Sequence, residues 1–150
     1  MGFFSLRDGQ PATSPFAGIY GPKVMIINES AGSGGDALPY YFRLRKIGPL
    51  VGTRTWGGLV GTLGFPETID GGGITAPNLA FYNLEGKWDV ENIGVAPDIL
   101  VEHTPVEVIK GRDPQLERAV AEALKLLEQK PVKRLPRPAP IDRVTRRTVN

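Results

Sequence analysis

The sequence has no cysteine and only one histidine among its 150 residues. The missing cysteines exclude disulfide bonds, thiolate metal sites and a cysteine nucleophile, and they favour a reducing, cytoplasmic setting. No apolar run approaches the ~20 residues that a membrane-spanning helix needs, and residues 1–10 lack the basic and apolar regions of a signal peptide. No cluster of histidine and carboxylate residues has metal-ligand spacing, so we predict no metal and no cofactor.

Glycine and proline are abundant, at 19 and 14 residues, and they predict many turns. The net charge of +2 is unevenly spread, because residues 130–150 hold seven basic residues against Asp142 alone. The prolines of this stretch favour an extended, solvated tail over a functional basic patch. The tail has no aromatic residue to stack on bases, so we expect no nucleic-acid partner, and no membrane partner either. We therefore divide the chain into residues 1–129 and a basic, proline-rich tail at 130–150.

The first third of the chain predicts a strand, a tight turn and a helix. Residues 1–22 carry glycine and proline at short intervals and predict irregular chain, whereas the β-branched run 23–28 fits a buried strand. A helix is predicted to begin with Asp36 as its N-cap and with Pro39 in its first turn. The apolar positions of this helix are Leu38, Tyr41, Phe42 and Ile47.

Short strands and glycine-rich loops follow. A buried strand is predicted at the start of 49–61. The rest of this stretch is rich in glycine and is predicted to be a loop that contains Trp56. Hairpins are predicted within 67–88, and a further strand at 95–102.

The clearest element is a helix that begins with Asp113 as N-cap and Pro114 in the first helical position. One apolar stripe of this helix is predicted to face the core: Leu116, Val120, Ala123, Leu124 and Leu127. The mixed order of strands and helices predicts an α/β layer fold.

Ser33 lies between glycines in the turn that joins the first predicted strand to the first predicted helix. A serine in such a turn can act as a nucleophile, because its hydroxyl stands clear of the sheet and the helix N-terminus favours a developing oxyanion. Alternatively, Gly34 and Gly35 could donate to an anion in a backbone nest, or the stretch could be a plain turn. A phosphate-binding P-loop is excluded, because no Gly-Lys-Ser/Thr follows the glycines.

Four longer stretches occur in a characteristic order: NESAGSGGDALPYYFR, GPLVGTRTWGGLVG, WDVENIGVAPDILVE and GRDPQLERAVAEALKLL. Over about residues 20–129 the chain thereby resembles the C-terminal part of the catalytic domain of tricorn-type peptidases, within the tail-specific serine protease family. The resemblance implies a crotonase-like layered core, of which this chain is a partial domain. It also implies a serine peptidase that trims short or unstructured peptides and assembles as a homo-oligomer.

The resemblance assigns roles to individual residues. Ser33 matches the nucleophile, the backbone N–H of Gly34 matches one arm of the oxyanion hole, and Glu91 matches the acid that orients the catalytic histidine. Asp36 is interpreted as a helix cap. Gly58 stands where relatives with a Ser-Lys dyad carry the lysine of a GxxTxGK motif, so a Ser-His-Glu arrangement is implied.

The histidine of that arrangement is not supplied by a matching position. The only histidine, His103, follows the strand predicted at 95–102, whereas the family's base lies upstream of the serine motif. We therefore expect the histidine on an upstream segment missing from this sequence, and we expect this chain alone to be inactive. The alternative is a non-catalytic oligomerisation or peptide-binding module derived from the same fold.

Three further residues are candidates for substrate binding. Trp56, with Arg54 in the same loop, could offer a flat apolar face to a peptide, although burial of the ring against the core would explain it equally well. Asp8 could meet a basic side chain of the substrate, or it could simply form an Asp-Gly turn.

Overall fold

The computed structural model describes residues 2–133 and 136–139. Its backbone divides into two compact units, one formed by residues 22–130 and the other by the described residues before and after them. Most of the tail predicted at 130–150 lies outside the described residues, so the predicted division at residue 129 stays a prediction. In the part of the chain that the structure describes, no helix combines the length and apolar character needed to cross a membrane.

The N-terminal segment is a hairpin, so the expectation of irregular chain at 1–22 was wrong. Strand β1 (Gly2–Phe4) pairs antiparallel with β2 (Ala12–Ser14), and Phe4 stacks on Phe16 at a ring-centroid distance of 5.7 Å. The glycine and proline residues lie mainly in the connection between the strands and beyond them, which hid the short strands from a composition argument.

Residues 22–130 are built on a three-stranded parallel sheet in the order β3-β4-β7. The strands are β3 (Met25–Ile27), β4 (Leu50–Gly52) and β7 (Ile99–Leu100). Val51 lies opposite Ile26 on one side and Ile99 on the other, and all three residues of β4 are buried. Each predicted strand therefore exists, and the buried one is central, as an all-apolar run in a parallel sheet requires.

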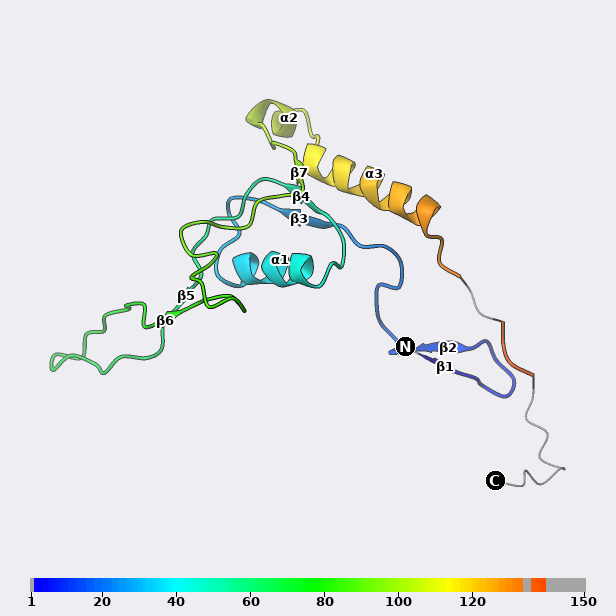
Figure 1. Cartoon of the computed structure of the whole chain (residues 1–150), viewed down its shortest axis with the longest axis horizontal. Helices are drawn as coiled ribbons and strands as arrows, with labels where there is room; N and C mark the ends of the chain where they lie inside the picture. The colour runs from blue at the N-terminus through cyan, green and yellow to red at the C-terminus, as the bar shows by residue number, and fades with distance from the viewer. Residues whose placement is uncertain (1, 134–135, 140–150) are drawn as a thin grey trace, which may run out of the picture. The chain divides into compact units, whose positions relative to one another are not determined.

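Two helices pack against this sheet, α1 (Gly34–Leu44) on β3 and α3 (Pro114–Gln129) on β3 and β4. In Figure 1 they lie on opposite sides of the three strands. A third, one-turn helix, α2 (Pro105–Ile109), follows β7 and was not predicted. The predicted α/β layer fold is confirmed in this form.

Helix α1 begins three residues earlier than predicted. Its N-cap is Ser33, so Asp36 lies in the first turn and Pro39 inside the helix; the interpretation of Asp36 as a cap was wrong. The buried residues of the helix are Asp36, Pro39 and Phe42, whereas the apolar residues Leu38 and Tyr41 are 61% and 48% exposed.

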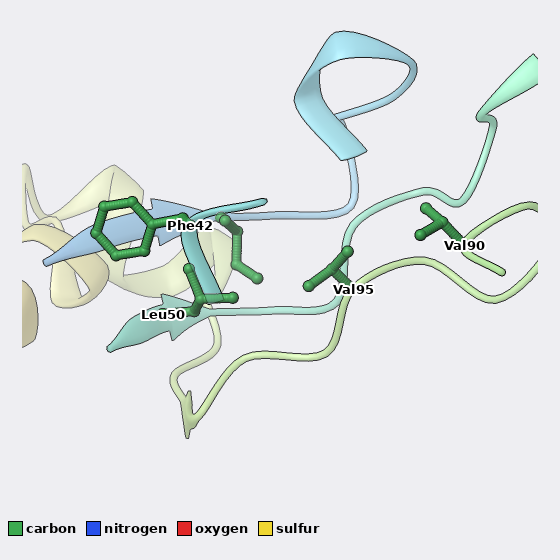
Figure 2. Packing of buried hydrophobic residues seen from close by; sticks show 5 residues of the cluster. Phe42, Leu50, Val90 and Val95 are labelled. Carbon is green, nitrogen blue, oxygen red and sulfur yellow. The ribbon is translucent and has the colours of Figure 1, made fainter. Parts of the chain in front are cut away.

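Buried apolar side chains join the sheet to the segment that precedes β7. The cluster consists of Ile27, Phe42, Leu50, Val90 and Val95. In Figure 2 the labelled side chains follow one another from Phe42 and Leu50, through Val95, to Val90. Burying each such side chain contributes roughly 1.5–3 kcal/mol. The irregular segment around Val90 is thus anchored to the core and positioned by it.

The region between β4 and β7 is mostly irregular. Strands β5 (Val60–Gly61) and β6 (Leu79–Ala80) form one antiparallel pair, and Tyr82 forms an isolated bridge with Trp88 within the predicted hairpin region. The stretch 67–70, predicted as β-prone, is instead part of a turn, because the N–H of Thr68 donates to the carbonyl of Gly72.

Helix α3 begins as predicted, and the carboxylate of Asp113 accepts the N–H of Leu116 at 2.9 Å. Its predicted core stripe is wrong for this chain. The helix meets the sheet through Gln115 and Ala119, whereas the large side chains of the stripe are 40–56% exposed, namely Leu116, Val120, Leu124 and Leu127. The helical spacing of the apolar residues was predicted correctly, but the three-stranded sheet covers only the side of α3 that carries Gln115 and Ala119.

Candidate active site

Ser33 occupies a sharp turn between β3 and α1. Its backbone has φ 54° and ψ −110°, a sparsely populated conformation for a residue other than glycine. Its N–H donates to the carbonyl of Gly58 at 3.0 Å, and its carbonyl accepts the N–H groups of Asp36 and Ala37. The residue is exposed, and its side chain makes no capping hydrogen bond to α1. The hydroxyl therefore stands at the surface on a strained elbow, a geometry suited to a nucleophile.

Gly34 provides an N–H beside this hydroxyl. It is the first residue of α1, and the first N–H groups of a helix have no partner within the helix. A Cβ on Gly34 would meet no described atom within 4 Å, so the space beside it is open. The N–H of Gly35, by contrast, already donates to the carbonyl of Gly32 at 2.8 Å, which removes one of the two donors that an anion nest would use.

The loop that follows β4 is held against the serine turn by Asp36. This side chain is completely buried, and its two oxygens accept the N–H groups of Gly57 at 2.8 Å and Gly58 at 3.0 Å. The N–H of Trp56 also donates to the carbonyl of Ala31. Asp36 and the bond from Trp56 to Ala31 thus fix residues 56–58 against the serine turn. The sequence did not predict this role of Asp36.

Trp56 lies over this junction. Cβ atoms added at Gly32 and at Gly58 would lie 2.5 and 2.6 Å from its indole ring, so both glycines make room for it. Trp56 is nevertheless 67% exposed, so of the two alternatives left open for this residue, burial of its ring against the core is wrong. The Arg54 guanidinium donates to the carbonyl of Ile93 at 2.6 Å and to that of Thr55 at 3.2 Å. Arg54 therefore links the loop after β4 to the segment around Ile93.

Glu91 lies in a tight bend on the other side of the same loop. Its neighbours Val90 and Asn92 have φ of 69° and 59°, which turns the chain sharply on both sides of it. The Asn92 N–H donates to the carbonyl of Gly57 at 2.7 Å. Within the described residues, the buried Oε2 of Glu91 has no hydrogen-bond partner. A buried carboxylate oxygen without a donor is costly, and its presence calls for an explanation.

The segments of Ser33 and Glu91 therefore meet at one dipeptide. The carbonyl of Gly58 holds the N–H of Ser33, and the carbonyl of Gly57 holds the N–H of Asn92, next to Glu91. Thr55 adds a second link, because it exchanges hydrogen bonds with Val95 through its N–H and its Oγ1.

The remaining candidates lie elsewhere. His103 is exposed after β7. The pKa of Glu29 is lowered mainly by the hydrogen bond from Thr53, at 2.5 Å, with a smaller contribution from His103. Asp8 is exposed in the N-terminal unit, and its proposed role stays a prediction. Among the described side chains, no three histidine, aspartate or glutamate groups gather as a metal site would require.

Comparison with known proteins defines the class. The model of Peptidase family S41 matches residues 7–101, and the chain belongs to that family. The resemblance to tricorn-type peptidases within it is confirmed by relatives and by a solved structure.

The chain is 43% identical over 132 residues to "Putative tricorn protease homolog 2" of Streptomyces coelicolor, covering 87% of this chain and 11% of that protein. It is 41% identical over 129 residues to "Tricorn protease" of Thermoplasma volcanium, covering 86% of this chain and 12% of that protein. The structure described as "Crystal structure of the tricorn protease" matches with a TM-score of 0.78 at 37% identity, covering 85% of this chain and 12% of that one. The chain thus spans about an eighth of the length of these relatives or less.

Proposed function

We propose that the chain supplies the nucleophile and the orienting acid of a tricorn-like serine peptidase of the tail-specific type, acting through Ser33 in a Ser-His-Glu arrangement. The observation that carries the proposal is the buried, unpartnered Oε2 of Glu91, next to the loop that also holds the N–H of Ser33. Such an oxygen could accept a hydrogen bond from an imidazole N–H. Family membership and the tricorn relatives support a serine-type peptidase independently.

The reaction divides into acylation and hydrolysis. The Ser33 Oγ attacks the scissile carbonyl carbon and gives its proton to the histidine, and the oxyanion is stabilised by the N–H of Gly34 at the start of α1. The histidine then protonates the leaving amine as the C–N bond breaks. In the second half, water loses a proton to the histidine and attacks the acyl carbon, and the histidine returns this proton to the Ser33 Oγ as the ester C–O bond breaks. Glu91 holds the histidine in the required tautomer throughout.

The general base is proposed to come from outside this sequence. His103 is exposed after β7, and the resemblance matches it to no catalytic position. We propose that a histidine on a separate segment enters between Glu91 and Ser33, and that this chain is inactive without it. The crotonase-like core is proposed to be completed by the same additional sequence.

The proposed substrate is a short or unstructured peptide. The exposed face of Trp56 beside the Ser33 turn supports an apolar wall for the peptide. Arg54 shapes that wall indirectly through its bonds to the loop, and Asp8 is a candidate for contact with a basic substrate side chain. Assembly into a homo-oligomer and a cytoplasmic location complete the proposal.

A chimera tests this function. Residues 20–129 would replace the matching segment of the Thermoplasma volcanium relative, and hydrolysis of fluorogenic peptides would be measured. We expect activity that Ser33→Ala reduces by roughly 10⁴-fold or more. The matched control is Ser30→Ala, which removes the other hydroxyl of the same loop and is expected to change kcat less than twofold. A correctly assembled chimera without activity, or activity that survives Ser33→Ala, would refute the proposal.

A second candidate function is a non-catalytic oligomerisation or peptide-binding module. The exposed apolar stripe of α3 favours it, because contiguous apolar surface marks sites of protein contact. Labelling with a fluorophosphonate discriminates the two functions. In the chimera, Ser33 reacts if the site is catalytic and stays unmodified if the fold serves only as a module.

A further inference from the structure

We infer that Asp36 is a positioning residue of the proposed site, whose buried carboxylate fixes the Gly57-Gly58 peptide and thereby holds the segments of Ser33 and Glu91 in register. The inference rests on the proposed function for its catalytic meaning. Its structural content can be tested without catalysis.

The bonding pattern of Asp36 carries the first step. The side chain is 0% exposed, and each of its oxygens accepts one backbone N–H, from Gly57 and from Gly58. Hydrogen bonds to a carboxylate in a buried setting are stronger than bonds between neutral groups. Because Asp36 is in the first turn of a regular helix, its side chain is itself well fixed. It therefore ties a flexible glycine pair to a rigid element.

The other side of the glycine pair carries the second step. The two N–H groups face Asp36, and the two carbonyls hold the N–H groups of Ser33 and Asn92 at 3.0 and 2.7 Å. A glycine peptide is conformationally permissive, so nothing in its own sequence fixes these carbonyls. Displacement of both glycines away from Asp36 would release both bonds, and the elbow of Ser33 and the bend at Glu91 would lose their common support.

The position of Gly58 gives this arrangement a functional meaning. By the resemblance drawn from the sequence, this position corresponds to the lysine of a Ser-Lys dyad, and in this chain it carries no side chain. Its backbone instead accepts from Ser33 and donates to Asp36. The loop here positions groups of the site rather than contributing a base. Asp36 does not contact the reacting atoms in this arrangement, so it is not a catalytic residue.

The test is residue-resolved amide hydrogen exchange on the whole chain carrying Asp36→Asn. Asparagine keeps the size of the side chain but replaces one acceptor by a donor, so one glycine N–H faces another donor. We expect exchange to quicken about tenfold or more at Gly57 and Gly58 and, through their carbonyls, at Ser33 and Asn92. The amides of Met25 and Thr53, which bond across the sheet, are expected to stay within twofold.

The matched control is Asp98→Asn. Asp98 also accepts a backbone N–H, from Leu50 at 2.8 Å, but it lies outside the glycine junction. Asp98→Asn is expected to leave the amide exchange rates of Ser33 and Asn92 unchanged. Quickening limited to Gly57 and Gly58 would overturn the inference, because the coupling through the carbonyls would then be absent. Equal quickening at Met25 and Thr53 would overturn it too, since Asp36 would then support the fold as a whole.

A second variant covers the case in which asparagine unfolds the chain. Asp36→Glu keeps both acceptors and the charge, and it is expected to keep Ser33 and Asn92 within threefold of the wild-type exchange rates. A spectroscopic readout accompanies both variants: with Trp88 replaced by Phe, the fluorescence of Trp56 reports the loop directly. We expect Asp36→Asn to shift its emission and Asp36→Glu to restore it. A shift of equal size with Asp36→Glu would contradict the need for a carboxylate.

Kinetics in the chimera separate this inference from the proposed function. We expect Asp36→Asn to lower kcat by about 10–100-fold with KM within twofold, because bound substrate meets a misaligned site. If the chimera has no activity at all, the proposed function fails and the exchange results still decide the role of Asp36. If the chimera is active and kcat is unaffected by Asp36→Asn, positioning by Asp36 is refuted.

Discussion

At the scale of single residues, we predict a large loss of activity when Glu91 is replaced, because its Oε2 has no hydrogen-bond partner among the described residues. In the chimera, Glu91→Gln keeps the size of the side chain and removes the charge that orients and stabilises the imidazolium. We expect kcat to fall by about 10³–10⁴-fold with little change in KM, measured by steady-state peptide hydrolysis. Glu85→Gln is the matched control, because Glu85 is exposed and paired with Lys87 on the nearby turn. Equal losses in both variants would contradict the role of Glu91.

Gly57 is predicted to be intolerant of any side chain. Its φ is 85°, and an added Cβ would lie 2.6 Å from the backbone nitrogen of Gly94. Gly86 has a similar φ of 74° but open space around it, so it isolates the conformational cost. Urea unfolding is expected to show a loss of about 1 kcal/mol for Gly86→Ala and about 3 kcal/mol or more for Gly57→Ala. Equal losses would mean that the junction with Gly94 relaxes freely.

The ion pair of Arg112 and Glu117 predicts a local pH effect. The hydrogen bond from Arg112 is the main reason that the pKa of Glu117 is lowered from its ordinary value. Because the folded-state pKa is lowered, the pair favours the folded state above the unfolded pKa, and this contribution is lost as pH falls through the folded pKa. Carboxyl NMR titration should show the pKa of Glu117 rising in Arg112→Met and unchanged in Arg118→Met, which alters only the pair with Glu122.

At the scale of elements, substitutions on the two sides of α3 are predicted to differ in their effect on stability. Ala119 faces the sheet and is 6% exposed, whereas Leu124 lies on the outer stripe and is 56% exposed. Ala119→Leu is expected to cost about 1–3 kcal/mol by overpacking. Leu124→Ser is expected to stay within about 0.5 kcal/mol in urea unfolding. A loss above 1 kcal/mol for Leu124→Ser would show that something covers the stripe in solution.

The elements differ in how far the sequence could predict them. The run 23–28 and the cap at Asp113 are local signals, and both led to the right element. The orientation of α3 depends on which surface the sheet offers, and no pattern within 113–129 contains that information. The cap of α1 was misassigned because Asp36 is a good N-cap residue, but its carboxylate is committed to backbone groups at Gly57 and Gly58, far along the chain.

The site shows the same limit. Ser33 and Glu91 were selected through a resemblance, and their segments meet through carbonyls of Gly57 and Gly58 whose bonding no local pattern encodes. The exposure of Trp56 likewise depends on two glycines that leave room beneath its ring. Residue types and turn chemistry could therefore be read from the sequence, whereas contacts across more than twenty residues required the fold.

At the scale of the whole molecule, the balance of buried and exposed apolar surface is unusual. Among the described residues, seven apolar side chains are buried, whereas four large side chains of one stripe of α3 lie open to solvent. Monomeric proteins rarely leave contiguous apolar surface of this kind uncovered. This open stripe supports the proposal that the chain functions in contact with further protein.

The position of β4 between β3 and β7 sets an order of events during folding. Its pairing with β3 needs only the α1 connection, but β7 joins after the long irregular region 53–98, whose closure costs more chain entropy. The β3-α1-β4 portion should therefore form early, and the bend at Glu91 should consolidate last. In pulse-labelled refolding, the amide of Thr53 is expected to gain protection before that of Val101, which bonds to Gly52 across the second pairing. A translating ribosome would release the Ser33 turn already shaped, before the bend at Glu91 has formed.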